Sequence, residues 1–198
     1  FTDSMIEVIG KYPNIMPSVH LPVQSGSSRI LKLMGRRYTK ESYVELFNKI
    51  KETVPGVSIS TDIIVGFPGE TEEDFLETLD LVGQCKYDNA FTFVFSAREG
   101  TPAARLKDET SQKEKEDRLQ RLNEVVNKYF LENNKKLEGT ILPVLLEGTS
   151  EKKDMYFGYS DTNKLINFVT NKKHEVGEIV NVKITSAKTW SLDGELDG

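Results

Sequence analysis

Glycines mark the point where a predicted strand gives way to a predicted helix between residues 60 and 75. The apolar run ends at Val65, Gly66 and Gly69 follow, and a helix is predicted over residues 71–84. Ligands of parallel α/β folds bind at the carboxyl ends of the strands. Glycine there lets the backbone approach a ligand, and Ile64 gives an apolar surface for a flat ring such as adenine. The alternative is a tight turn that needs glycine only for its backbone conformation.

Polar residues also follow two other predicted strands. Gln24 and Ser25 lie at the end of the first strand, and Ser96 and Arg98 follow the third. These side chains offer hydrogen bonds to a ribose or a carboxylate, and Arg36 and Arg37 offer a bidentate contact to an anion. Each group taken alone also fits a solvated turn or cap. Three successive strands that end in small and polar residues indicate that one rim of the sheet is a binding site.

Two carboxylates lie in the glycine-containing stretch, and an acid–base pair is one interpretation of Asp62 and Glu70. In the other interpretation, Asp62 fixes nearby backbone or a basic partner, and Glu70 favours the start of its helix through the helix dipole. The sequence alone assigns no catalytic residue.

Cys85 is the only cysteine among the 198 residues. This count excludes a disulfide within the chain, and it excludes a metal or iron–sulfur site built on several thiolates of this chain. Because Cys85 ends a predicted helix on its apolar flank, we expect it to pack in the core.

The elements that position these residues alternate between strand and helix. Apolar periodicity and capping residues predict strands over residues 18–24, 57–65 and 90–95 and helices over residues 40–53 and 71–84. This alternation is typical of parallel strands joined by crossover helices.

A long, charged helix is predicted over residues 111–134, and the sequence changes in kind after it. Short apolar stretches separated by turn residues then predict a small all-β barrel of about 60 residues. The predicted domains are residues 1–134, an α/β part with its linking helix, and residues 135–198, the β-barrel.

Four lysines in two loops of the predicted barrel are the candidates for RNA binding: Lys152, Lys153, Lys172 and Lys173. Aromatic residues are interspersed with them, and basic loops with aromatics suit RNA whose unstacked bases lie on the rings. In the alternative, the aromatics, Trp190 among them, form the barrel core and the lysines serve solubility.

The composition is that of a soluble globular protein, with 37% hydrophobic residues, 29% charged residues and a net charge of −5. No apolar run approaches the roughly 20 residues of a membrane helix, so a cytoplasmic protein without membrane contact is expected. The negative charge does not indicate a strongly basic nucleic-acid binder, although one face of a near-neutral module can still bind RNA.

Five segments together resemble one family: "HLPVQSGS", "MGRRYT", "DIIVGFPGETEEDF", "FSAREGTPAA" and "NVKITSAKTWSLDGE". They are similar to the radical S-adenosylmethionine tRNA methylthiotransferases, and the similarity covers essentially the whole chain. The segments "EGTSEKK" and "KTWSLDGE" look most like the type that modifies N6-isopentenyladenosine beside the anticodon. The threonylcarbamoyladenosine relative remains an alternative.

The resemblance implies a fold and a set of binding residues. The α/β part would be the C-terminal portion of a partial (β/α)6 radical S-adenosylmethionine barrel, and the small barrel would be a TRAM domain that binds the tRNA anticodon stem-loop. Ile64 and Gly66 would lie beside the adenine, and Gln24 and Ser25 near the ribose or methionyl part. The residues implied for cofactor binding are Gln24, Ser25, Ile64, Gly66, Ser96 and Arg98.

The resemblance also implies an activity that this chain lacks the means to perform alone. Such enzymes insert sulfur and a methyl group at C2 of the adenine by radical chemistry, using S-adenosylmethionine, two [4Fe-4S] clusters and an electron donor. The family holds its clusters on a Cys-x3-Cys-x2-Cys loop and three further cysteines, and Cys85 matches neither set. We therefore expect a C-terminal piece of a larger enzyme that is inactive by itself. Phe95 is a smaller departure, because the family often has tyrosine there.

A stand-alone RNA-binding module with a vestigial α/β half is the alternative from a different functional class. In either case, the apolar strand edges of a truncated barrel predict a homodimer, since open edges tend to find partners.

Overall fold

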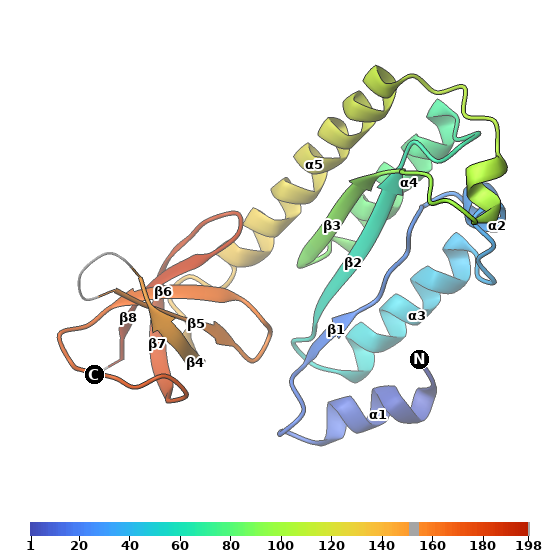
Figure 1. Ribbon diagram of the computed structural model, residues 1–198. Helices are drawn as coiled ribbons and strands as arrows, with labels where there is room; N and C mark the ends of the chain where they lie inside the picture. Colours follow the sequence, from blue (N-terminus) through green and yellow to red (C-terminus); the bar gives the residue numbers. More distant parts are fainter. Residues whose placement is uncertain (151–154, 198) are drawn as a thin grey trace. The chain divides into compact units, whose positions relative to one another are not determined.

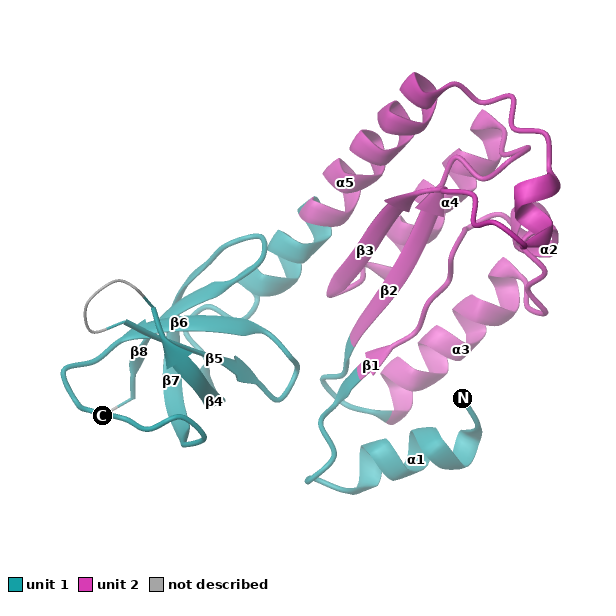
Figure 2. Ribbon diagram, in the orientation of Figure 1, with its two compact units in different colours: residues 1–18, 54–58, 128–198 teal, residues 19–53, 59–127 magenta. Residues whose placement is uncertain are grey.

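The computed structural model describes residues 1–150 and 155–197. The chain divides into two compact units, which Figure 2 shows in different colours. Unit 1 comprises residues 1–18, 54–58 and 128–198, and unit 2 comprises residues 19–53 and 59–127.

A three-stranded sheet with the order β1-β2-β3 lies at the centre of the α/β part (Figure 1). Its strands are β1 (Ser18–His20), β2 (Ser58–Val65) and β3 (Asn89–Val94). Strands β2 and β3 run parallel, with Asp62 opposite Phe91 and Ile64 opposite Phe93. Helix α4 (Glu72–Cys85) connects them, so the predicted strand–helix–strand unit is confirmed.

The first strand is shorter than the predicted strand over residues 18–24. Strand β1 ends at His20, and Pro22, which has no N–H to donate, interrupts the ladder. The segment beyond it still runs beside β2, since the backbone N–H groups of Leu21 and Gln24 donate to the carbonyls of Ser60 and Asp62, both at 2.8 Å.

Helices α3 (Lys40–Thr53) and α4 supply much of the core of unit 2. Helix α3 has the predicted bounds and buries three residues of its apolar stripe, Tyr43, Phe47 and Ile50. Helix α4 buries Phe75 and Val82 of its apolar stripe, whereas Leu79 is only half-buried. Thr78 is buried in its place, because its hydroxyl accepts a 2.9 Å hydrogen bond from the backbone N–H of Gly26.

Capping boxes open two of the helices. In α4 the Thr71 hydroxyl accepts from the backbone N–H of Asp74, and the Asp74 carboxylate accepts from that of Thr71. The same exchange joins Ser111 and Glu114 at the start of α5 (Gln112–Lys135). Polar side chains thereby satisfy N–H groups that a helix start leaves without partners.

The buried stripe of α5 contains two cations that the apolar pattern does not predict. Leu122, Val126 and Phe130 are buried, whereas Leu119 is only half-buried. Lys115 and Arg118 continue the buried stripe toward the N-terminus of the helix, each with 6% of its surface exposed.

The predicted barrel is confirmed as a closed five-stranded sheet of order β4-β5-β6-β8-β7. Its strands are β4 (Ile141–Thr149), β5 (Met155–Ser160), β6 (Leu165–Val169), β7 (Ile179–Ala187) and β8 (Leu192–Leu196). The core consists of Val144, Leu146, Ile166, Phe168, Val182, Ile184 and Leu192.

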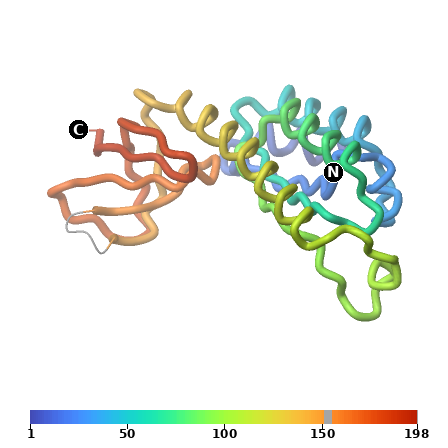
Figure 3. Tube along the Cα trace, turned by 90° about the horizontal axis from the view of Figure 1, so that it is seen from above, coloured from blue at the N-terminus to red at the C-terminus, as the bar shows by residue number. Residues whose placement is uncertain are grey.

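Three shorter helices complete the described elements: α1 (Asp3–Lys11), α2 (Ser28–Leu33) and the 3-10 helix η1 (Pro102–Arg105). The segment between β3 and α5, which carries η1, extends away from the rest of unit 2 as a loop (Figure 3). No helix in the described ranges is long and apolar enough to cross a membrane.

Candidate functional site

A pocket of about 300 Å³ lies at the carboxyl ends of β2 and β3. Ile64 lines it from β2, and Phe67 and Phe95 line it from just beyond the two strands. The rings of Phe67 and Phe95 meet edge to face, with centroids 5.0 Å apart. The pocket lies at the predicted rim of the sheet and its surface is largely apolar. Of the six residues predicted for cofactor binding, it is lined only by Ile64.

Two other segments of unit 2 complete the pocket wall. Leu33, Met34 and Arg36 come from the end of α2 and the turn after it, and Thr101 comes from the loop before η1. Leu33 and Arg36 are exposed, and Arg36 is the one cationic residue of the pocket lining. This composition fits a flat, apolar ring that carries an anionic group.

The pocket residues Phe67, Phe95 and Leu33 were not among the predicted site residues. Phe67 and Phe95 could have been found from the sequence, because each follows one of two neighbouring parallel strands. Leu33 could not, since it reaches the pocket only through the position of α2.

Gln24 and Ser25 lie in buried backbone beside β2. Gln24 has a φ of +69° and its carbonyl accepts from the N–H of Ile64 at 2.9 Å. The Ser25 hydroxyl is fully buried, accepts from the N–H of Ser27 at 3.2 Å and lies 3.5 Å from the Thr78 hydroxyl. The structure thus uses Ser25 inside the fold, while Gln24 connects the loop to the strand that bears Ile64.

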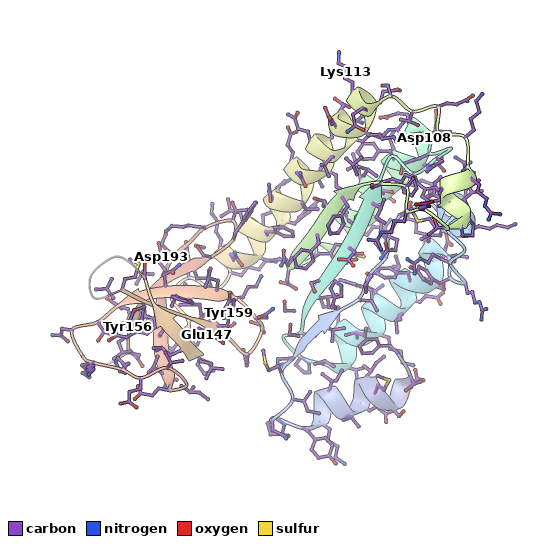
Figure 4. All side chains as sticks on the ribbon, viewed as in Figure 1. Asp108, Lys113, Glu147, Tyr156, Tyr159 and Asp193 are labelled. Carbon is purple, nitrogen blue, oxygen red and sulfur yellow. The ribbon has the colours of Figure 1, made fainter. Side chains whose placement is uncertain are left out.

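Gly66 has a φ of +71°, and the space that a side chain would fill there is already occupied. A Cβ atom would come within 2.5 Å of Cγ and 2.8 Å of Cδ in Lys115. The Lys115 ammonium group pairs with Asp108, which lies on the segment leading into α5 (Figure 4). The glycine therefore serves the packing of α5 against this loop, as well as the backbone turn.

Glu70 reaches back to the same loop. One of its carboxylate oxygens accepts from the backbone N–H of Gly66 at 2.8 Å and from Arg118 at 3.0 Å. Burial raises the pKa of Glu70, and the hydrogen bond from Gly66 and the charge of Arg118 offset this only in part. The interpretation of Glu70 as a simple helix-start charge is therefore wrong.

Asp62 and Glu70 have separate partners, so the structure does not form the acid–base pair. The Asp62 carboxylate lies 3.4 Å from the Nε2 atom of His20, whose Nδ1 atom lies 2.9 Å from the Ser60 hydroxyl. The expectation that Asp62 fixes a basic partner is confirmed.

Asp74 joins the loop after β1 to the loop after β2. Its carboxylate accepts from Ser27 at 2.7 Å and from the Nε atom of Arg29 at 3.1 Å, and Arg29 also donates to the carbonyl of Gly69 at 2.6 Å. Burial alone would raise the Asp74 pKa, but hydrogen bonds from Arg29, Ser27 and Thr71 outweigh it and hold the pKa well below its usual value.

Ser96 and Arg98 are exposed residues of the loop after β3. The carbonyl of Arg98 accepts from the N–H and the hydroxyl of Thr101, at 3.2 and 2.7 Å. These bonds hold the turn that brings Thr101 to the pocket, whereas neither predicted residue is itself among the pocket lining.

The loop lysines of the barrel are described only in part. Lys172 and Lys173 are exposed and lie between β6 and β7. Lys152 and Lys153 fall outside the described residues. The start of β5 pairs with the end of β6 through Met155 and Val169.

The described residues do not fit an iron–sulfur cluster. They contain no group of three or more histidine, cysteine, aspartate or glutamate side chains that could hold a metal ion. Cys85 is buried in the core, as predicted, and burial raises its pKa to about 11, which disfavours the thiolate form that binds iron.

Comparison with known proteins gives two family matches. Residues 1–82 match the radical SAM superfamily, and residues 135–196 match the TRAM domain. The first match contains β2 and most of the pocket-lining residues, and the second contains the closed barrel.

Curated relatives match nearly the whole chain. The tRNA-2-methylthio-N(6)-dimethylallyladenosine synthase of Bacillus cytotoxicus is 55% identical over 197 residues, which are 99% of this chain and 38% of that protein. Those of Anoxybacillus flavithermus and Bacillus licheniformis are 52% and 53% identical, over 37% and 39% of their own length and 99% and 100% of this chain. The chain thus spans less than two fifths of the length of these relatives. Nearly the whole chain is thus similar to part of these synthases, with a radical SAM match in its first half and a TRAM match at its end.

Proposed function

We propose that this chain is the part of a tRNA methylthiotransferase that binds the adenosyl group of S-adenosylmethionine and contacts the tRNA. The reaction of the whole enzyme would add a methylthio group at C2 of N6-dimethylallyladenosine, also called N6-isopentenyladenosine, beside the anticodon. The observation that carries the proposal is an apolar pocket at the carboxyl ends of parallel strands, in a chain 55% identical to such a synthase.

The adenine would lie against Ile64, Phe67 and Phe95, because a flat heteroaromatic ring is best accommodated by an apolar and aromatic surface. Gly66 would let the backbone approach the ring. Arg36 at the pocket is suited to the carboxylate of the methionyl part. Gln24, Ser25, Ser96 and Arg98 remain proposed neighbours of the ribose and methionyl groups, with Ser25 acting through the loop that it holds.

The three-stranded sheet would form the C-terminal portion of a partial (β/α)6 barrel. Two [4Fe-4S] clusters would be bound by cysteines that this chain does not contain, and they would supply the reduction of S-adenosylmethionine and the sulfur. An electron donor would be the further partner of the whole enzyme. Because Cys85 cannot replace those ligands, we predict no methylthiotransferase activity for this chain alone.

The TRAM barrel would bind the anticodon stem-loop, with Lys152, Lys153, Lys172 and Lys173 contacting phosphates. A homodimer of the chain is also proposed, with exposed Phe91 and Phe93 of the sheet in its interface. Sedimentation of the Phe91→Ser variant tests it, since a dimer built on this face should become a monomer.

Calorimetric titration with S-adenosylhomocysteine tests the adenosyl site. Phe95→Ala should weaken binding at least about fivefold, because stacking of a base on an aromatic ring contributes about 1–3 kcal/mol. Phe93→Ala is the matched control, since Phe93 is half exposed and does not line the pocket. Absence of binding, or equal effects of the two substitutions, would contradict the proposed site.

A further inference from the structure

Trp190 is the only tryptophan of the chain, and 73% of its surface is exposed. Large aromatic side chains usually bury most of their surface, so this degree of exposure is unusual. The barrel core is complete without it: Phe168 and six aliphatic residues fill the interior. The interpretation that places Trp190 in the barrel core is therefore wrong.

The turn that carries Trp190 is held in place from several sides. The buried Asn134 side chain, at the end of α5, donates to the carbonyls of Lys188 and Thr189 at 2.8 and 3.1 Å. The N–H of Lys188 donates to the carbonyl of Ser191 at 2.9 Å, which closes the turn. Such support limits the conformational entropy that the turn would lose when a ligand binds.

One further bond anchors the approach to this turn. The N–H of Ala187, the last residue of β7, donates to the carboxylate of Glu138 at 2.9 Å. Trp190 is thus an exposed ring presented by a rigid support, which is the arrangement expected of a binding residue.

The lysine of this turn is paired with a carboxylate. The Lys188 ammonium group lies 2.5 Å from the carboxylate of Asp193, a residue of β8 that is labelled in Figure 4.

Strands β6 and β8 are parallel, with Ile166 opposite Leu192. Lys164 precedes Ile166 by two residues, and Trp190 precedes Leu192 by two. The β5–β6 turn and the Trp190 turn therefore lie at the same end of the barrel.

The lysine loop lies at the other end of the same two strands. Lys172 and Lys173 follow the end of β6, whereas Trp190 precedes the start of β8. Five strand residues separate the two ends, which is about 17 Å at ~3.3 Å per residue. An RNA strand that follows the β6–β8 pair would therefore meet a cationic loop at one end and an aromatic ring at the other.

We propose that Trp190 is a base-stacking residue that binds an unstacked nucleobase of the tRNA, separate from the phosphate-binding lysines. This inference rests on the proposed tRNA binding and adds its aromatic contact. An indole ring stacks on any base without sequence preference. Because Lys188 is paired with Asp193, the contact contributes through stacking rather than through net charge.

The test uses the whole chain and a synthetic anticodon stem-loop RNA, with and without N6-dimethylallyladenosine. Trp190 is the only indole fluorophore, so its emission should be quenched as RNA binds. Trp190→Ala should weaken binding about 5- to 150-fold, while Trp190→Phe should keep most of the affinity. The dependence of affinity on salt should be the same for wild type and Trp190→Ala, because the substitution removes no cation that faces a phosphate.

Ile179→Ala is the matched control for loss of an exposed apolar side chain, since Ile179 is 70% exposed on β7. It should leave RNA affinity unchanged, and thermal unfolding should be similar for all variants. If labelled RNA binds but neither the emission nor the Trp190→Ala affinity changes, the inference fails while the proposed tRNA binding stands. If no RNA binds at all, both fail together.

Discussion

Glu70 and Arg118 form an ion pair inside unit 2, with 3.0 Å between Oε1 and Nη1 and side-chain exposures of 1% and 7%. Arg118 also donates to the backbone carbonyl of Glu70 at 3.1 Å. The pair joins the loop that opens α4 to the first turns of α5. The same Glu70 oxygen accepts a hydrogen bond from the N–H of Gly66. Glu70 therefore links Arg118 of α5 to the loop that carries Phe67.

Loss of Arg118 should therefore destabilise the fold strongly. Arg118→Met keeps much of the side-chain volume but leaves the Glu70 carboxylate buried and without its cation, which costs about 3–5 kcal/mol when a buried pair is broken. Urea unfolding measures the change. Lys107→Met is the control, since Lys107 pairs with Glu109 at the surface and exposed pairs contribute about 0–1 kcal/mol. Similar losses in the two variants would contradict the role of the buried pair.

The raised pKa of Glu70 predicts a particular dependence of stability on pH. Because the folded pKa lies above the usual 4.5, the folded state binds more protons than the unfolded state between these values. The contribution of Glu70 is therefore fully present below 4.5 and is lost as pH rises through the folded pKa. The stability of wild type relative to Glu70→Gln should fall over this window.

Urea unfolding of both proteins from pH 4.5 to neutral pH checks this slope. Asp74 does not affect this slope. Its folded pKa is lowered, so its contribution to the free energy of unfolding is present above the usual 3.8 and is lost only at more acid pH. A difference between the two proteins that stays constant, or rises with pH, would show that burial does not govern Glu70.

The local parts of this site were predictable and the long-range parts were not. Thr71 and Asp74 cap a helix through contacts three residues apart, and short-range chemistry of this kind is visible in the sequence. Arg118 lies in a highly charged helix, and its partner Glu70 is 48 residues away along the chain. Nothing local distinguishes Arg118 from a solvated arginine, and only the packing of α5 on the loop makes it a core residue.

Trp190 is the opposite case, because its type suggested a core residue and the structure exposes it. An aromatic residue beside a strand is normally assigned to the core, but in this barrel Leu192, two residues later, is the residue that points inward. The position of the pocket, by contrast, could be predicted, because the carboxyl ends of parallel strands meet at one edge whatever the details of the helices.

Crowding by Lys115 can be separated from backbone strain by comparing two glycines. Gly66 and Gly56 both have a φ of +71°, but a Cβ would meet Lys115 at the first and nothing within 4 Å at the second. Gly56→Ala should cost about 1–2 kcal/mol from the left-handed backbone alone. Gly66→Ala should cost about 1–3 kcal/mol more, which is typical of overpacking.

The double variant Gly66→Ala with Lys115→Ala completes the comparison. Truncation of Lys115 removes Cγ and Cδ, the two atoms that the new Cβ would approach most closely, and leaves only the Lys115 Cβ at 3.1 Å. The two substitutions should therefore be less destabilising together than the sum of their separate effects. Thermal and urea unfolding of the four proteins give this coupling. Strict additivity would mean that Lys115 does not crowd Gly66 in solution.

Binding of phosphates by the barrel lysines should appear in the salt dependence of RNA affinity. Replacing Lys152, Lys153, Lys172 and Lys173 by alanine should weaken binding of an anticodon stem-loop. The slope of log affinity against log salt should fall by about 0.7–0.9 for each phosphate that is no longer neutralised. Fluorescence anisotropy across a range of salt concentrations measures both quantities.

Two double variants that remove the same number of charges show whether the salt dependence comes from the barrel lysines. Lys172→Ala with Lys173→Ala removes two charges from the barrel, and Lys107→Ala with Lys113→Ala removes two from outside it. Lys113 projects from the start of α5 (Figure 4). Only the barrel variant should lower the slope, because counterion release requires a cation that faces a phosphate. If the two double variants shift the slope equally, the barrel loops are not the phosphate-binding surface, and the net charge of −5 governs the salt dependence instead.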